Sequence, residues 1–544
     1  MSFMKPVNPS PREQSPILVR AMQWLDDCAK ALRDTCERKK LLLLGGVSLV
    51  YFVTTSLLAS RKPMWNDELF TYFIAQAPTL SGIWSALLTG ADQNPFPFYV
   101  LTRWSLAVFG VQEWALRLPE MVGVWVAGLC VFSIVARQTE GLYGFVAMVF
   151  LFVTGANFYS FEARPYGLVL GFSALAWFFW LQATQGRSRK LTVPGLAASL
   201  ASAVCSHYYA VFVFVPLGIG ELVRSMVRRR VDWPIWFAML SALSPLVFLA
   251  PLIEQARTYS QGFWARPSLH SIPEAYAVLL MPTPLLVLAV LLISGAYSLT
   301  LSLEVRHPTL VKHSRVPLQE VAVTCGFVVL PFIAIVATLL TTGAFTFRYA
   351  LPMVLGVSVL MAVAFWRLFQ GQPVVGVAFL LLLFTGFGML FVRSIHSTPE
   401  ASLGKVYELI TREPIISFPV VISDAHSFMM LSQYAPHELS SRLVYLADPK
   451  ASLRHLGYDT VDRGILDLKP WFGFHIEEYS QYLEEQPRFL VYVNGGRPGG
   501  LNWLLTELAS APYHIELRAK IDDHLLFLVT SNASLQAVSL KKQQ

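Results

Sequence analysis

Long apolar segments separated by short polar stretches occupy most of the first 393 residues. The first, 41–60, has no charged residue and is long enough to cross a bilayer as a helix. Similar segments follow at 119–136, 141–158, 166–183, 191–206, 208–226, 233–253, 276–303, 321–343, 347–366 and 373–392. The pattern predicts an α-helical polytopic membrane domain over 41–393. It follows a cytoplasmic tail, 1–40, in which 17–38 is expected to form an amphipathic surface helix.

The apolar segment 95–111 is an exception, because it contains Arg103 and begins with two closely spaced prolines. The positive-inside rule assigns the basic runs at 38–40, 187–190, 228–230 and 306–315 to the cytoplasm. All four basic runs lie on the cytoplasmic side only if the chain has eleven spans and 95–111 does not cross the membrane. We therefore expect a long external loop, 61–118, with helices on the membrane surface, a cytoplasmic N-terminus and an external C-terminus. Arg103 and Arg117 would anchor this loop to lipid headgroups. The alternative is twelve spans with one basic loop on the wrong side.

After residue 393 the pattern changes to short β-branched and aromatic runs, typical of strands. They lie at 419–424, 443–448, 488–494 and 524–530, and helical patterns at 475–484 and 501–510 lie between some of them. Strands that alternate with helices predict a small α/β domain over 394–544. The membrane topology places this domain outside the cytoplasm.

Composition agrees with a membrane protein. Of 544 residues, 54% are hydrophobic and only 14% are charged, against roughly 25% charged in soluble domains. The net charge of +7 comes largely from the basic runs between spans, so it gives no reason to expect nucleic acid. All five cysteines precede the C-terminal domain, in which no structural disulfide is therefore expected.

Polar motifs far apart in the sequence fall at one predicted face of the membrane, the outer one. Ionisable groups at such positions usually mark a substrate site. They are Asp67, Glu68, Asp92, Asn94, Glu162, Arg164, His207, Tyr208, Tyr209, Arg348 and Tyr349.

These residue types suit recognition of an anionic lipid beside a base. Arg164 and Arg348 are able to hold a phosphate group, and the His–Tyr–Tyr run adds hydrogen-bond donors. A carboxylate at Asp67 or Glu68 is able to take a proton from an attacking hydroxyl. Glycosyl transfer from a phosphate-linked sugar needs these parts, because the leaving phosphate requires cationic stabilisation.

Six short motifs, in order, resemble the GT-C superfamily of integral-membrane glycosyltransferases. The resemblance is greatest to the branch of the protein O-mannosyltransferases and the bacterial aminoarabinose transferases. It covers roughly 40–400 and rests on WNDE (65–68), NPFPFY (94–99), RLPE (117–120), EARPY (162–166), HYY (207–209) and RYALP (348–352). In the second motif, Pro95 and Pro97 flank Phe96, whereas the family has adjacent prolines.

The resemblance implies an inverting transfer of sugar from a polyprenyl-phosphate donor to an acceptor hydroxyl at the outer face of a bacterial inner membrane. Asp67 is the expected general base, with Glu68 and Glu162 as further catalytic candidates. The expected substrate-binding residues are Asn94, Arg164, Tyr166, His207, Tyr208, Tyr209, Arg348 and Tyr349. Membrane lipids and other envelope-glycan enzymes are the expected partners. No cofactor is obligatory, and a divalent metal ion, if one is used, would bind at Asp67 and Glu68.

Other interpretations stay open. Asp67 is also placed to cap a helix, and Glu162 and Arg164 are spaced to form a local ion pair. A transporter or flippase for an anionic lipid-linked sugar would use similar residues. Such a protein favours ionisable groups near the middle of the membrane, whereas the apolar segments here are nearly uncharged. A structural or sensor protein with a working external domain is the third class.

Overall fold

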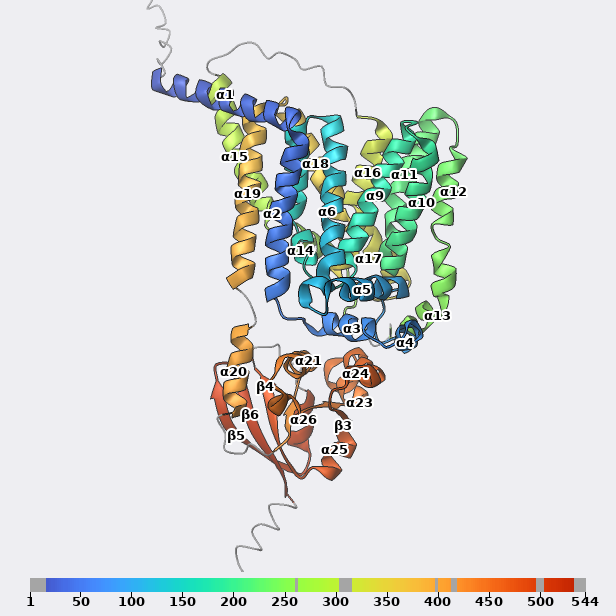
Figure 1. The fold of residues 1–544 in the computed structure, drawn as a ribbon, viewed down its shortest axis with the longest axis vertical. Coiled ribbons are helices and arrows are strands. Elements are labelled where there is room, and N and C mark those ends of the chain that lie inside the picture. The colour runs from blue at the N-terminus through green and yellow to red at the C-terminus, as the bar shows by residue number, and fades with distance from the viewer. Residues whose placement is uncertain are drawn as a thin grey trace, which may run out of the picture.

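The computed structural model describes residues 16–259, 263–302, 316–396, 400–411, 418–495 and 503–532. It has a helical bundle and, beyond one end of it, a domain built on a β-sheet (Figure 1). The amphipathic helix expected near the N-terminus is α1 (Pro16–Arg38), at the end of the bundle away from the sheet domain (Figure 1). The basic run at 306–315 and the first 15 residues lie outside the described residues.

Every apolar segment predicted to cross the membrane corresponds to a helix or to a broken pair of helices. Six helices of the described residues are long and apolar enough to span, or eight if two bent pairs each count as one. The remaining candidates are shorter or less apolar, so the count of eleven stays a prediction. The bundle comprises α2 (Lys40–Arg61), α6 (Glu113–Gln138), α7 (Gly141–Val153), α9 (Tyr166–Thr184), α10 (Arg189–Ser206), α11 (Phe214–Arg228), α12 (Trp233–Ser241), α13 (Pro245–Thr258), α14 (Ser271–Leu280), α15 (Thr283–Ser302), α16 (Leu318–Val328), α17 (Leu330–Leu340), α18 (Met353–Leu368) and α19 (Pro373–His396).

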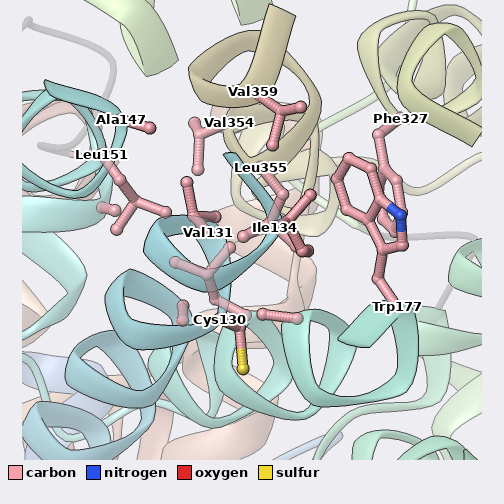
Figure 2. Close-up of a cluster of buried hydrophobic side chains, with 14 of the residues drawn as sticks. Cys130, Val131, Ile134, Ala147, Leu151, Trp177, Phe327, Val354, Leu355 and Val359 are labelled. Carbon is pink, nitrogen blue, oxygen red and sulfur yellow. The ribbon is translucent and has the colours of Figure 1, made fainter. Parts of the chain in front are cut away.

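The centre of the bundle is packed with aliphatic and aromatic side chains (Figure 2). Trp177 of α9 stacks on Phe327 of α16 with ring centroids 5.0 Å apart. Helices α6 and α9 approach each other closely at Gly123 and Gly171, because a Cβ on Gly171 would lie 2.5 Å from the carbonyl oxygen of Gly123. This contact fixes the start of α9 against α6, and both helices carry motif residues at the same end.

Ion pairs join the loops at the end of the bundle near α1. Asp232 accepts from Arg189 at 2.6 Å and from Arg224 at 3.0 Å, which brings the basic runs at 187–190 and 228–230 together. Arg137 pairs with Glu320 at the same end. The charge pattern thus separates the two ends of the bundle, while which side of a membrane each end faces stays a prediction.

Three helices lie across the other end of the bundle, between it and the sheet domain (Figure 1): α3 (Asn66–Ala75), α4 (Leu80–Leu87) and α5 (Phe96–Phe109). The segment 95–111 therefore forms a 14-residue helix beside the bundle end. Arg103 donates to the carbonyl oxygens of Ala75, the last residue of α3, and of Pro78, which follows the helix. The prediction that Arg117 meets lipid headgroups is wrong, because its side chain is completely buried.

The C-terminal domain is α/β, as the sequence predicts. Its six strands have the order β3-β2-β1-β4-β6-β5, in which the first four are parallel and β6 and β5 are antiparallel. They are β1 (Val420–Ile422), β2 (Leu443–Ala447), β3 (Ile476–Glu478), β4 (Arg488–Asn494), β5 (Tyr513–Ile521) and β6 (His524–Ser531). The helices are α20 (Glu400–Thr411), α21 (Ala425–Tyr434), α22 (His437–Ser440), α23 (Pro449–Leu456), α24 (Thr460–Phe472), α25 (Tyr479–Glu485) and α26 (Trp503–Ser510).

The sheet domain packs on the surface helices through α21 and α24. Phe472 lies against Phe70 and Phe73 of α3, with ring centroids 5.2 and 5.6 Å apart. The Tyr434 hydroxyl accepts from the backbone N–H of Met64 at 2.8 Å and donates to Glu113. One hydrophobic core therefore continues from the segment 61–118 into the C-terminal domain.

Candidate active site

The site begins at the first turn of α3, which the WNDE motif forms. Trp65 is the residue before the helix, so the alternative that Asp67 caps α3 is wrong. Successive helical residues point about 100° apart, because an α-helix has 3.6 residues per turn. Asp67 and Glu68 are therefore directed to different surroundings, and both gain from the positive end of the helix dipole.

Glu68 points into the protein. Its carboxylate oxygens accept from Arg117 Nε and Nη2, each at 2.7 Å, and one also accepts from the backbone N–H of Ala163 at 2.7 Å. Both side chains of the pair are fully buried. Burial alone raises the pKa of a carboxyl group, but the charges of Arg117 and Lys62 outweigh it and hold the pKa of Glu68 at about 2. The pair thus ties WNDE, RLPE and EARPY together.

Asp67 points toward a cavity and is much less restrained. Arg348 Nη1 lies 3.3 Å from its Oδ2, and a quarter of the Asp67 side chain is exposed. The backbone carbonyl of Asp67 accepts from Arg164 Nη1 at 3.1 Å. The carboxylate is therefore held near two guanidinium groups while remaining accessible.

Arg164 pairs with Asp92 and not with Glu162, so the alternative of a local ion pair in EARPY is wrong. Its two terminal nitrogens contact the two oxygens of Asp92 at 2.8 and 3.0 Å, a bidentate geometry. Asn94 donates to the same carboxylate at 2.9 Å. Asp92 was among the outer-face polar residues of the sequence but not among the predicted site residues, and the planar arrangement with Arg164 is what identifies it.

Aromatic rings surround His207 at the wall of the cavity. Its ring centroid lies 4.9 Å from that of Tyr349 and 5.4 Å from that of Tyr166, and Tyr209 stacks on Tyr349 at 4.3 Å. Burial, with the charges of Arg164 and Arg348, lowers the pKa of His207 to about 3. Nδ1 accepts from the backbone N–H of Tyr209, so the neutral ring carries its proton on Nε2.

These groups line a cavity of about 740 Å³, called the large cavity below. Of the eleven predicted site residues, Glu68 and Glu162 do not line it. The other nine do: Asp67, Asn94, Arg164, Tyr166, His207, Tyr208, Tyr209, Arg348 and Tyr349. Apolar side chains such as Ile253, Phe263 and Trp264 complete its walls. The C-terminal domain contributes Thr460 and Val461, which sequence reasoning missed because α24 carries no recognisable motif.

Glu162 lies instead at a second, smaller cavity of about 290 Å³. This small cavity is lined by Lys62, Trp65, Phe158, Tyr159, Glu162, Arg348 and His426. Arg348 lines both cavities. Burial raises the pKa of Glu162 to about 7, although Lys62 acts in the opposite direction.

The pair of carboxylates proposed for a metal ion does not fit one. Asp67 lines the large cavity, whereas Glu68 is fully engaged by Arg117 and does not. Among the described residues, no group of three or more His, Cys, Asp or Glu side chains is placed to hold a metal. Metal dependence stays a prediction.

Known proteins resemble the chain chiefly in fold. Residues 92–253 match a family model described as dolichyl-phosphate-mannose-protein mannosyltransferase. The structure matches ArnT from Cupriavidus metallidurans in the apo state, with a TM-score of 0.55 at 12% identity over 90% of this chain and 98% of that one. The undecaprenyl-phosphate-bound structure of the same protein gives a TM-score of 0.53, with the same identity and coverage. The chain has the GT-C fold. The fold predicted from the motifs is thereby confirmed, and no curated protein sequence matches.

Proposed function

We propose that the protein is an inverting glycosyltransferase that moves a sugar from a polyprenyl-phosphate donor to an acceptor hydroxyl, with Asp67 as the general base. The observation that carries the proposal is the accessible carboxylate of Asp67 beside Arg348 at the wall of the large cavity. The undecaprenyl phosphate bound by the ArnT of similar fold supports a lipid phosphate as the leaving group. The apolar walls at Ile253, Phe263 and Trp264 suit a prenyl chain.

The other carboxylates near the large cavity are worse candidates for the base. Asp92 is bonded by both terminal nitrogens of Arg164 and by Asn94. Glu68 is buried under Arg117. A base needs an oxygen within hydrogen-bond reach of the acceptor, and Asp67 is the least engaged of the three. We therefore assign Glu68 and Asp92 the role of positioning residues.

In the proposed step, Asp67 takes the proton of the acceptor hydroxyl as its oxygen attacks the anomeric carbon. The bond from that carbon to the phosphate oxygen breaks on the opposite face, and the electron pair leaves with the phosphate. Arg348 and Arg164 stabilise the charge that develops there. The products are the glycoside with inverted configuration, polyprenyl phosphate and a protonated Asp67. The Nε2–H of neutral His207 and the hydroxyl of Tyr208 are further donors at this wall, whereas the Tyr209 hydroxyl donates to the carbonyl oxygen of Ala344 at 2.9 Å.

Asp67→Asn tests the assignment, because the amide keeps the shape of the carboxylate and cannot take the proton. Purified protein in nanodiscs is given a panel of polyprenyl-phosphate sugars, and released polyprenyl phosphate and product are measured by mass spectrometry. A loss of about 10²–10⁴-fold in turnover is expected. Asp448→Asn is the matched control, since Asp448 caps α23 and lines neither cavity, and asparagine caps equally well. Turnover equal to wild type in Asp67→Asn would contradict the assignment and direct attention to Glu162.

The transporter alternative predicts a different result. A flippase would show no turnover with any donor, yet would move a fluorescent lipid-phosphate sugar across proteoliposomes. The crowding of charged groups at one end of the bundle, around a cavity that the accessible carboxylate of Asp67 lines, favours the enzyme.

A further inference from the structure

The small cavity concentrates polar atoms that have no hydrogen-bond partner. Both carboxylate oxygens of Glu162, the Nζ of Lys62 and the indole Nε1 of Trp65 are buried without a hydrogen-bond partner in the described structure. Glu162 is completely buried, and all three side chains line this one cavity. The charge of Lys62 lies 4.8 Å from the centre of the Phe158 ring and 3.7 Å from a Glu68 oxygen. Buried polar atoms without partners are rare in folded proteins because each costs free energy. Their presence at one cavity indicates that a ligand bound there supplies their hydrogen-bond partners.

The chemistry of these atoms restricts the ligand. Lys62 and Trp65 present hydrogen-bond donors, whereas Glu162 presents acceptors and, when protonated, a donor. No ion pair joins Lys62 to Glu162, although both line the cavity; Lys62 lies 3.7 Å from Glu68, whose oxygens Arg117 already occupies. A ligand that contacts both must therefore supply donors and acceptors side by side. Adjacent hydroxyl groups on a ring do so.

The remaining walls are aromatic. Phe158, Tyr159 and Trp65 line the cavity, and Phe158 is half exposed at its rim. Aromatic faces suit the apolar C–H face of a sugar ring, while a peptide side chain such as serine offers no such face. The volume of about 290 Å³ lies at the lower end of small-molecule sites, which accommodates one ring and not a long chain.

The small cavity also lies next to the proposed reaction centre. Arg348 lines both cavities, reaching Asp67 with Nη1 and lying 5.9 Å above the ring of Trp65. A molecule in the small cavity is thus adjacent to the base but separate from the apolar walls of the large cavity. His426 of α21 closes one side, its ring 6.3 Å from that of Trp65, so the C-terminal domain takes part.

We propose that the small cavity binds a sugar ring of the acceptor, with Glu162, Lys62 and Trp65 bonding its hydroxyls and Phe158 against its apolar face. The inference rests on the proposed function and deepens it, because it assigns the acceptor to the carbohydrates. Glu162 is on this assignment an acceptor-binding residue.

Two measurements on the full chain in lipid nanodiscs test it. The first is saturation-transfer NMR with methyl glycosides of glucose, galactose, mannose and N-acetylglucosamine, without donor. Wild type is expected to transfer saturation to at least one glycoside, and the signal is expected to disappear in Glu162→Leu and Phe158→Ala. Leucine removes the unpartnered carboxylate without leaving a hole, so folding does not suffer, and Phe158 is exposed enough to be truncated safely. His437→Ala, an exposed histidine of the same domain as His426, is expected to bind as wild type does.

The second measurement compares the KM values of the two substrates, using the best glycoside and a serine-containing peptide as acceptors. In Glu162→Leu, the KM for the glycoside is expected to rise about tenfold more than the KM for the donor. Absence of glycoside binding in wild type, equal binding in both variants, or transfer to the peptide alone would overturn the proposal. Glycoside binding without any turnover of any donor would instead overturn the proposed function and, with it, the acceptor role of this cavity.

Discussion

The buried pair of Glu68 and Arg117 should contribute more to stability than any exposed ion pair of the protein. Arg117 contacts both oxygens of Glu68 and donates to the carbonyl oxygens of Ala59, Lys62 and Pro63. Removing one partner of a buried pair leaves the other charge without compensation, at a cost of about 3–5 kcal/mol. Arg117→Met also leaves three carbonyl groups without a donor, so its cost should lie at the upper end of that range. Glu68→Gln keeps the shape of the side chain and should cost about 3 kcal/mol.

The double variant should be less destabilised than the sum of the two single variants. Once Arg117 is absent, Glu68 keeps only the weaker contact with Lys62 at 3.7 Å, so removing Glu68 as well adds little further destabilisation. The expected interaction free energy between the two sites is about 2 kcal/mol or more. Lys405→Met is the matched control, since Lys405 and Asp522 form an exposed ion pair in the C-terminal domain, and no measurable change is expected.

The assay is unfolding in bicelles by added SDS, followed by tryptophan fluorescence, which gives a free energy for each variant. Additive effects of the two single substitutions would refute the reasoning, as would an Arg117→Met variant as stable as Lys405→Met. Either result would mean that Arg117 contacts water or lipid, as the sequence suggested.

Three further changes have expected outcomes. Asp92→Asn weakens the bidentate contact with Arg164 and should lower turnover about tenfold, measured as released polyprenyl phosphate, with little effect on folding. Burial raises the pKa of Glu162 from 4.5 to about 7, so the folded state prefers the protonated carboxyl group. The free energy of unfolding of wild type, relative to that of Glu162→Gln, should therefore fall by about 3 kcal/mol between pH 4.5 and pH 7 and stay constant above pH 7. SDS unfolding at a series of pH values measures this difference. Phe472→Ala removes the contact with Phe70 and should weaken the packing of the C-terminal domain on the bundle. The expected result is faster tryptic cleavage near residue 405, with the helical circular-dichroism signal of the bundle retained. An unchanged cleavage rate would count against the domain contact.

The sequence predicted the structure well where a single segment determines its own secondary structure. An uncharged run such as 41–60 has few alternatives to a membrane-spanning helix, and closely spaced prolines with Arg103 made 95–111 unsuitable as a span. The α/β class of the C-terminal domain followed from its strongest strands. By contrast, the helix expected at 475–484 is in part β3 (Ile476–Glu478), because its charged residues have helical spacing and only pairing with β2 decides otherwise. The edge strand β5 (Tyr513–Ile521) has many exposed positions and gave no apolar signal.

Partners within the site could not be read from the sequence, because they join motifs that are far apart. Arg117 was placed at lipid headgroups on its position in a surface loop, yet it lies against Glu68, 49 positions earlier. A local ion pair of Arg164 with Glu162, two residues away, was the alternative to a site role, yet Arg164 pairs with Asp92 across 72 positions. Motif order identifies which residues gather at one end, whereas packing decides which charges neutralise each other.

The two adjacent carboxylates of WNDE illustrate why that decision matters for chemistry. Two ionised carboxylates directed at one point would repel each other, and one of the two would be held partly protonated. The helical turn of about 100° between Asp67 and Glu68 avoids this, since it directs one into the protein and the other to the large cavity. Glu68, paired with Arg117 and bonded to the backbone of Ala163, keeps α3 against the start of α9. Asp67 thereby keeps a fixed position beside Arg348 without itself needing the strong contacts that would block it.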